Sequence, residues 1–196
     1  MRGSHIRRLT EALVVAALLT VGAAPAHANL ITNGGFEAGL TGWTTGGSVA
    51  IDSTNPHSGS NDAAFGAGGV LFWTVGVPTT VGKSYTVSYW IQSDPVVDLP
   101  GAPGSGFYLF SSTFAGISFP NISGASGFAY TPITQTFVAT NSVSPLTFFG
   151  FRISSGTDLF RLDDVSVELV PEPTTVGLLG AGLLGLAGVL RRRSHS

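Results

Sequence analysis

The sequence predicts an all-β fold, an antiparallel sandwich flanked by two hydrophobic terminal segments. Of the 196 residues, 43% are hydrophobic and only 10% are charged, whereas an average soluble domain has roughly 25% charged residues. The 27 glycines and 11 prolines favour turns and short strands over long helices. This composition disfavours an all-α fold and a disordered, highly charged chain.

The clearest strand covers residues 83–92, where every second residue is apolar. Such alternation is typical of a strand with one buried face. Other segments are rich in β-branched and aromatic residues and are bounded by Gly, Pro, Asn or Asp, and their spacing predicts a jelly roll. Residues 94–105 and 120–127 are expected to be long loops. In the strand over residues 83–92, the residues expected to be buried are Tyr85, Val87, Tyr89 and Ile91. The other expected strands cover residues 70–77, 106–110, 132–140, 146–153 and 160–169.

The N-terminus predicts an export signal. Three arginines precede an apolar run over residues 12–24, and the segment ends in a small-x-small pattern at Ala26 and Ala28. Signal peptidase accepts this pattern, so residues 1–28 are expected to be a signal peptide that is removed. The run is shorter than the ~20 residues that span a bilayer, which disfavours a membrane anchor as the alternative. Twin-arginine export is a further alternative, but the residues after Arg8 match that signal poorly.

The C-terminal residues 170–196 have three parts in strict order. A proline-flanked glutamate comes first, an uncharged stretch over residues 174–190 follows, and three arginines end the pattern. As a helix, the uncharged stretch would be ~26 Å long, marginally enough to cross a ~30 Å hydrocarbon core. The positive-inside rule then places the arginines in the cytoplasm and the rest of the chain outside. The motif residues are Pro171, Glu172, Pro173, Arg191, Arg192 and Arg193.

This tail resembles the PEP-CTERM sorting signal of exported proteins in Gram-negative bacteria that make extracellular polysaccharide. The resemblance implies that an exosortase, a membrane transpeptidase-like enzyme, recognises Pro171, Glu172 and Pro173 and removes the tail. It therefore implies export across the inner membrane, transient anchoring by a transmembrane helix, and a final place at the cell surface or outside the cell. The alternative is a plain C-terminal anchor that is never cut.

Residues 29–169 remain as one domain of ordinary length. They contain three basic and nine acidic residues, a formal net charge of −6, and no cluster of cations that would bind nucleic acid. An acidic domain is compatible with neutral glycans or a divalent cation as partners. The chain has no cysteine, which removes disulfides, thiolate metal sites and cysteine nucleophiles.

Both ends of this domain carry familiar patterns. The opening segment 29–37 reads NLITNGGFE, Gly42-Trp43 and the HSGS of residues 57–60 follow it, and the domain closes on LDDVSV at residues 162–167. Together they resemble galactose-binding-like jelly rolls, in particular carbohydrate-binding modules of the CBM4/9 type. The resemblance implies a glycan-binding sandwich. For an exported protein with this sorting signal, the expected glycan ligand is an exopolysaccharide.

A structural Ca²⁺ is expected between the opening loop and the closing strand, with Glu37, Asp163 and Asp164 as ligands. Ca²⁺ takes six to eight oxygens, which carboxylates and turn carbonyls supply together. The apolar alternation also changes phase between Leu162 and Val165, which predicts a β-bulge beside the aspartates. The resemblance to CBM4/9 modules implies the same ion. The alternative is a pair of solvated acids near a strand end.

Trp90 is the best candidate for a sugar-stacking platform, because it shares the polar face of its strand with Gln92. Arg152 and Phe148 are expected to border the same groove, on the face of their strand opposite Phe149. The alternative is that a loop such as 94–105 covers Trp90. Trp43 and Trp73 are expected in the core.

Catalysis is not expected from these residues. His57, the only histidine of the domain, is expected in an exposed loop, and no nucleophile elbow or zinc-binding helix motif occurs. Asp163 and Asp164 are adjacent on a strand, so they are expected to point to opposite faces and not to act as an acid/base pair. Three hypotheses remain: a glycan-binding surface protein, a structural or adhesive protein without a glycan pocket, and a glycan hydrolase.

Overall fold

The computed structural model describes residues 28–66, 69–73, 76–153, 159–171 and 182, and gives only the backbone of residues 69–73. Contacts group the chain into two units, Ala28–Val170 and a second unit of Met1–His27 with Pro171–Ser196. The first unit is described below. The expected signal peptide, apart from Ala28, and the apolar stretch of the tail, apart from Gly182, lie outside the described residues. Within the described residues, no helix has the length and apolar character needed to span a bilayer.

Thirteen strands form in the described part of the chain. All the main pairings between them are antiparallel, which confirms the predicted all-β sandwich. The strands are β1 (Trp43–Gly46), β2 (Val49–Asp52), β3 (Asp62–Phe65), β4 (Gly69–Trp73), β5 (Val77–Pro78), β6 (Ser84–Ser93), β7 (Phe107–Phe114), β8 (Ile117–Ser118), β9 (Ile122–Gly124), β10 (Phe128–Val138), β11 (Val143–Ser144), β12 (Leu146–Ile153) and β13 (Phe160–Leu169).

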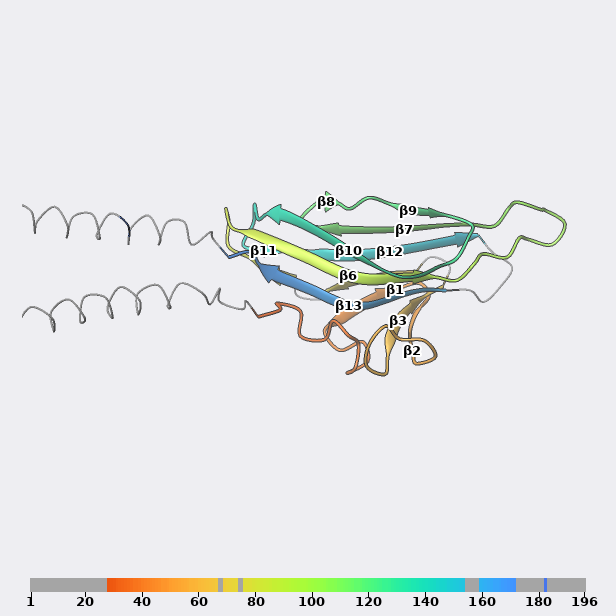
Figure 1. Cartoon of the computed structure of the whole chain (residues 1–196), viewed down its shortest axis with the longest axis horizontal. Helices are drawn as coiled ribbons and strands as arrows, with labels where there is room; N and C mark the ends of the chain where they lie inside the picture. The colour runs from red at the N-terminus through yellow and green to blue at the C-terminus, as the bar shows by residue number, and fades with distance from the viewer. Residues whose placement is uncertain (1–27, 67–68, 74–75, 154–158, 172–181, 183–196) are drawn as a thin grey trace, which may run out of the picture. The chain divides into compact units, whose positions relative to one another are not determined.

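Two sheets form the sandwich (Figure 1). One has the order β1-β4-β12-β7-β8 with β9 also paired to β7, the other has the order β10-β6-β13-β3-β2, and β5 pairs with β11. The prediction missed β1, β2 and β3, because each has only four residues and little alternation. It was also wrong about residues 120–127, since β9 lies within that expected loop and pairs with β7.

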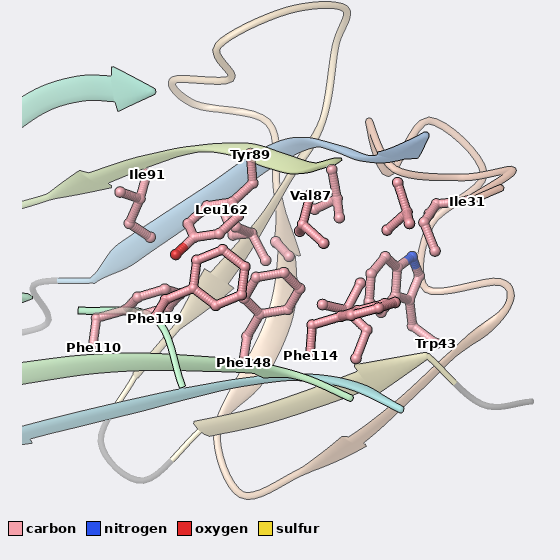
Figure 2. Packing of buried hydrophobic residues seen from close by; sticks show 14 of the residues in the cluster. Ile31, Trp43, Val87, Tyr89, Ile91, Phe110, Phe114, Phe119, Phe148 and Leu162 are labelled. Atoms are coloured by element: carbon pink, nitrogen blue, oxygen red, sulfur yellow. The ribbon is translucent and has the colours of Figure 1, made fainter. Parts of the chain in front are cut away.

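The core lies between the two sheets (Figure 2). On β6 the alternation is as predicted, with each of the four expected apolar side chains buried and each polar side chain of the strand partly exposed, apart from the buried Ser93. The ring centroid of Tyr89 lies 5.1 Å from that of Phe148 across the sandwich. Trp43 is buried as predicted, 5.4 Å from Phe36, and donates its indole N–H to the Asn33 carbonyl. The side chain of Trp73 lies outside the described residues.

The facing of β12 is the reverse of what the predicted groove requires. Phe148 is fully buried and Arg152 is 5% exposed, so these two side chains face the core. Phe149, Phe151 and Ile153 face outward. The alternation correctly grouped the side chains that share a face of this strand. It did not show which face is buried, because both faces carry aromatic residues.

The closing strand β13 contains the predicted bulge. Its register to β6 shifts between Asp163 and Ser166, and Asp164 has a φ of 50°. The opening segment packs against this irregularity: the N–H of Val165 donates to the Gly34 carbonyl at 2.9 Å. A Cβ on Gly34 would stand 1.9 Å from the Val165 carbonyl oxygen, so the close approach requires glycine at that position.

Candidate functional site

Two carboxylates of the bulge in β13 hold a turn over the outer face of the five-stranded sheet. Asp163 Oδ2 accepts hydrogen bonds from the backbone N–H groups of His57 and Ser58, both at 3.0 Å. Asp164 binds the side chains of the same two residues, with Oδ2 2.6 Å from His57 Nδ1 and Oδ1 2.7 Å from Ser58 Oγ. The prediction that the two aspartates point to opposite faces was therefore wrong, because the bulge turns both toward one turn.

The far side of the same turn is held by Glu37 from the opening loop. Its Oε1 accepts hydrogen bonds from the backbone N–H groups of Ser60 and Asn61, at 2.8 and 3.0 Å. Gly59 has a φ of 61°, and a Cβ on it would stand 2.3 Å from Glu37 Oε1. Residues 57–61 are called the anchored turn below.

Trp90 is covered by the anchored turn rather than by residues 94–105. The imidazole of His57 stacks on its indole with 3.9 Å between ring centroids and 17° between planes. Tyr130 approaches the same imidazole edge-on at 5.1 Å. His57 was expected in an exposed loop, which was wrong, because its side chain is stacked and bound to Asp164. Gln92, on the same face of β6, accepts a hydrogen bond from the Asn55 side chain at 2.8 Å.

A buried carboxylate lies beside this stack. Asp62 is fully buried, and its Oδ2 accepts a 3.0 Å hydrogen bond from the Tyr130 hydroxyl. Its Oδ1 is buried and has no hydrogen-bond partner among the described residues. Burial raises the pKa of Asp62 to about 7, and the nearby charge of Asp52 adds to the rise, while the hydrogen bond from Tyr130 opposes it. Burial also raises the pKa of Asp163.

Arg161 of β13 forms ion pairs with the acidic residues around Asp62. Its Nε donates to Asp52 at 3.0 Å, and its Nη1 donates to both oxygens of Asp94 at 2.9 Å. The guanidinium also lies 3.9 Å from Asp62 Oδ2. These contacts form a network of charged groups on the outer face of the five-stranded sheet. The sequence did not predict this network, because it joins residues that are far apart in the chain.

Arg152 does not border a groove with Trp90. Its guanidinium lies inside the sandwich, 4.8 Å from the centre of the Phe160 ring, and donates a 2.8 Å hydrogen bond to the Asp94 carbonyl. Trp90 points outward from the other sheet. The predicted set of Trp90, Gln92 and Arg152 is therefore not one surface.

On the outer face of the six-stranded sheet, the described outward side chains of β7 and β12 are apolar or carry hydroxyl groups. Phe107 is 40% exposed and Phe151 is 38% exposed, and the paired strands β7 and β12 place Phe107 opposite Ile153 and Leu109 opposite Phe151. No charged residue stands at an outward position of these two strands. The aromatic platform, as this surface is called below, consists of Phe107, Leu109, Phe149, Phe151 and Ile153.

The expected calcium ligands only partly converge. Asp163 Oδ1 and Asp164 Oδ1 lie 3.8 and 3.6 Å from the point where a Cβ on Gly35 would stand. Glu37 holds the other side of the anchored turn. Among the described residues, no group of three or more acidic or histidine side chains is placed to hold a metal ion. An ion at this place would need the two aspartates together with turn carbonyls, and it stays a prediction.

Two segments of the chain match known family models. Residues 28–97 match the model of a carbohydrate binding domain of the CBM4/9 type. Residues 169–193 match the PEP-CTERM protein-sorting motif. Both resemblances drawn from the sequence are confirmed. The first match covers β1 to β6, with Trp90 and the anchored turn, and ends before the strands of the aromatic platform. No curated protein matches the chain.

Solved structures share the fold at low sequence identity. TmCBM61 in complex with β-1,4-galactotriose is 16% identical with a TM-score of 0.53, and the alignment covers 74% of this chain and 99% of that one. A family 16 carbohydrate-binding module is also 16% identical, with a TM-score of 0.50 and coverage of 71% and 99%. The xylan-binding CBM22-1 domain of Paenibacillus barcinonensis Xyn10C is 18% identical, with a TM-score of 0.47 and coverage of 77% and 100%. The first two likenesses show the sandwich fold.

Proposed function

We propose that the chain is an exported, non-catalytic protein that binds a neutral glycan through the aromatic platform. The observation that carries this proposal is the exposure of Phe107 and Phe151 on a sheet face without charged residues. The apolar faces of sugar rings stack on exposed aromatic rings, and nearby hydroxyl groups fix their orientation. Ser111 and Thr147, also on this face of β7 and β12, supply such hydroxyls. The match to a carbohydrate binding domain supports the same ligand class.

The sorting motif supports the rest of the proposal. Signal peptidase removes residues 1–28, the apolar tail anchors the chain in the inner membrane of a Gram-negative cell, and an exosortase then cuts near Pro171, Glu172 and Pro173. The released protein associates with exopolysaccharide at the cell surface or outside the cell. Replacing Glu172 by Gln should make an uncut, membrane-bound form accumulate, which mass spectrometry and fractionation would detect.

The covered face of the five-stranded sheet supports a glycan site less well. One face of the Trp90 indole is occupied by His57, and Gln92 is bound to Asn55. Asp163 and Asp164 are hydrogen-bonded to the anchored turn, so these two carboxylates do not form a free pair across a cleft for a hydrolase. Trp90 and Gln92 therefore remain the second candidate for the glycan site.

Binding of the purified chain to host polysaccharide in affinity electrophoresis tests the choice. Phe151→Ala should weaken binding about tenfold, a change of about 1.4 kcal/mol, because a stacking ring is lost from the surface. Val81→Ala, at a residue that is 62% exposed elsewhere on the domain, is the control and should bind normally. Loss with Trp90→Ala but not with Phe151→Ala would move the site to the other sheet. No binding by the unmodified chain would favour a structural or adhesive role.

A further inference from the structure

One end of the sandwich exposes three valine side chains that the glycan site does not use. Val81, in the turn between β5 and β6, is 62% exposed, and Val138 and Val143 are each 53% exposed. Hydrogen bonds join their loops: the N–H of Gly82 donates to the Ala139 carbonyl at 2.8 Å, and Thr79 N–H donates to the Ser142 carbonyl at 2.9 Å. These three residues are called the valine tip.

The charge around the valine tip differs from that of the rest of the domain. Residues 79–83 and 138–145 contain Lys83 and no acidic residue, although residues 29–169 have a net charge of −6. Asp94 and Asp98 follow the other end of β6 and so lie away from the tip. The tip therefore exposes three valines among uncharged polar residues, with Lys83 in its turn and Glu168 opposite Thr86 on the neighbouring strand.

The C-terminal tail leaves the domain at this same end. The N–H of Val170 donates to the carbonyl of Ser84, the first residue of β6, at 2.8 Å. Figure 1 shows β13 and β10 ending where β6 begins. Only Pro171, Glu172 and Pro173 separate Val170 from the apolar stretch 174–190.

The length of this connector limits the distance between the valine tip and a membrane. Three fully extended residues reach about 10 Å. The polar headgroup layer on each side of the hydrocarbon core is roughly 5 to 8 Å thick. When residues 174–190 are in the bilayer, the connector therefore keeps Val170, at the end of the domain that carries the tip, within about 10 Å of the start of the apolar stretch.

We propose that the valine tip is a membrane-contact surface that rests in the headgroup layer of the bilayer holding the C-terminal tail. Valine side chains at this depth leave water for the boundary of the acyl chains. The contact would hold the connector with Glu172 at the membrane surface, where a membrane enzyme can reach it. This inference depends on membrane insertion of the tail, which is part of the proposed function, but not on the glycan site.

Single cysteines test the contact cleanly, because the chain has no native cysteine. The full chain carrying Val81→Cys or Val143→Cys is labelled with an environment-sensitive fluorophore and reconstituted into phosphatidylcholine vesicles. The control is Val97→Cys in the loop after β6, because Val97 is 53% exposed, as Val143 is. Both tip labels should shift to the blue and be quenched several-fold more strongly by spin-labelled lipids than the Val97 label.

The possible results distinguish the membrane contact of the valine tip from the membrane insertion of the tail, on which it depends. Equal emission and equal quenching at the three positions in chains that float with the vesicles would overturn the contact while leaving the anchored tail in place. A chain that fails to float with the vesicles would overturn the membrane insertion of the tail, and the contact with it. Loss of polysaccharide binding alone would bear only on the aromatic platform.

Discussion

On the outer face of the five-stranded sheet, the anchored turn and charged side chains cover the surroundings of Trp90, whereas the outer face of the six-stranded sheet exposes Phe107 and Phe151. On the first face, Asp163 and Asp164 satisfy the polar groups of the turn, and Arg161 binds Asp52 and Asp94. On the second face, the outward positions of β7 and β12 carry only apolar and hydroxyl side chains. The polar network fixes the fold on one side, whereas on the other side the described outward residues of β7 and β12 leave Phe107 and Phe151 more than a third exposed.

This difference separates residues that hold the structure from residues that meet a partner. A buried carboxylate with several donors is expensive to remove, because its donors lose their partner without gaining water. A half-exposed phenylalanine costs little to remove, because water already reaches much of its ring. The predictions below test that separation on each face, from the largest expected effect to the smallest.

Removing the carboxylate of Asp163 should have the largest effect. Asp163→Ala leaves the backbone N–H groups of His57, Ser58 and Asp164 without their acceptor, and should lower the free energy of unfolding by about 3 to 5 kcal/mol. Denaturant unfolding of the purified chain measures this change. Asp98→Ala is the matched control, since Asp98 also accepts two backbone hydrogen bonds, from Gly104 and Gly106, but is exposed. Equal losses for the two variants would show that burial of the network is not what matters.

The buried Asp62 should make stability depend on pH. Its pKa is raised from 3.8 to about 7, so the folded state holds a proton that the unfolded state releases. Stability should therefore fall as the pH rises from about 4 to about 7, and level off above that range. Asp62→Asn should remove this slope and raise stability at pH 8 by an amount on the order of 2 kcal/mol.

Unfolding of the two chains at a series of pH values checks this prediction, and the difference between them isolates Asp62 from Asp163, whose pKa is also raised. Asp98, in the exposed loop after β6, should have the opposite effect. Hydrogen bonds from Gly104 and Gly106 lower its pKa, so its contribution to stability is lost as the pH falls. Parallel curves for the unmodified chain and Asp62→Asn would mean that Asp62 stays charged in the folded protein.

Calcium should stabilise the domain through the residues around the anchored turn. If Asp163 and Asp164 share an ion with the carbonyls of the opening loop, millimolar Ca²⁺ added after EDTA treatment should raise the melting temperature by several degrees. Glu37→Gln should weaken that rise, since Glu37 holds the turn opposite the two aspartates. Superimposable melting curves with and without Ca²⁺ would remove the ion from the description of this domain.

The sequence was sufficient for the fold because the strongest periodicities belong to the central strands. On β6, Tyr85 to Ile91 alternate without exception, and the change of phase between Leu162 and Val165 correctly indicated the bulge in β13. The four-residue strands β1, β2 and β3 have too few residues for a period to be recognised.

The sites were harder to predict, because they depend on which face of each strand is buried and on contacts between segments that are distant in the sequence. Nothing local pairs His57 with Trp90, or Tyr130 with Asp62, since each pair joins different strands or loops. Aromatic residues at Phe148 and Phe149 made both faces of β12 look equally apolar. The charge of Arg152 then led to the wrong choice of the outer face of this strand. The side chain is in fact buried, with its guanidinium over the ring of Phe160.

The smallest expected effect compares one aromatic residue from each outer face. Trp90→Ala should cost about 1 to 2 kcal/mol of stability, because the indole packs under His57 and its loss also weakens the anchored turn. Phe151→Ala should change stability by less than about 0.5 kcal/mol, because the ring is 38% exposed and contributes to no charged network. Thermal unfolding of the two variants at the same pH provides the comparison. A loss at Phe151 as large as the loss at Trp90 would mean that the aromatic platform is part of the structural packing and not a surface kept open for a ligand.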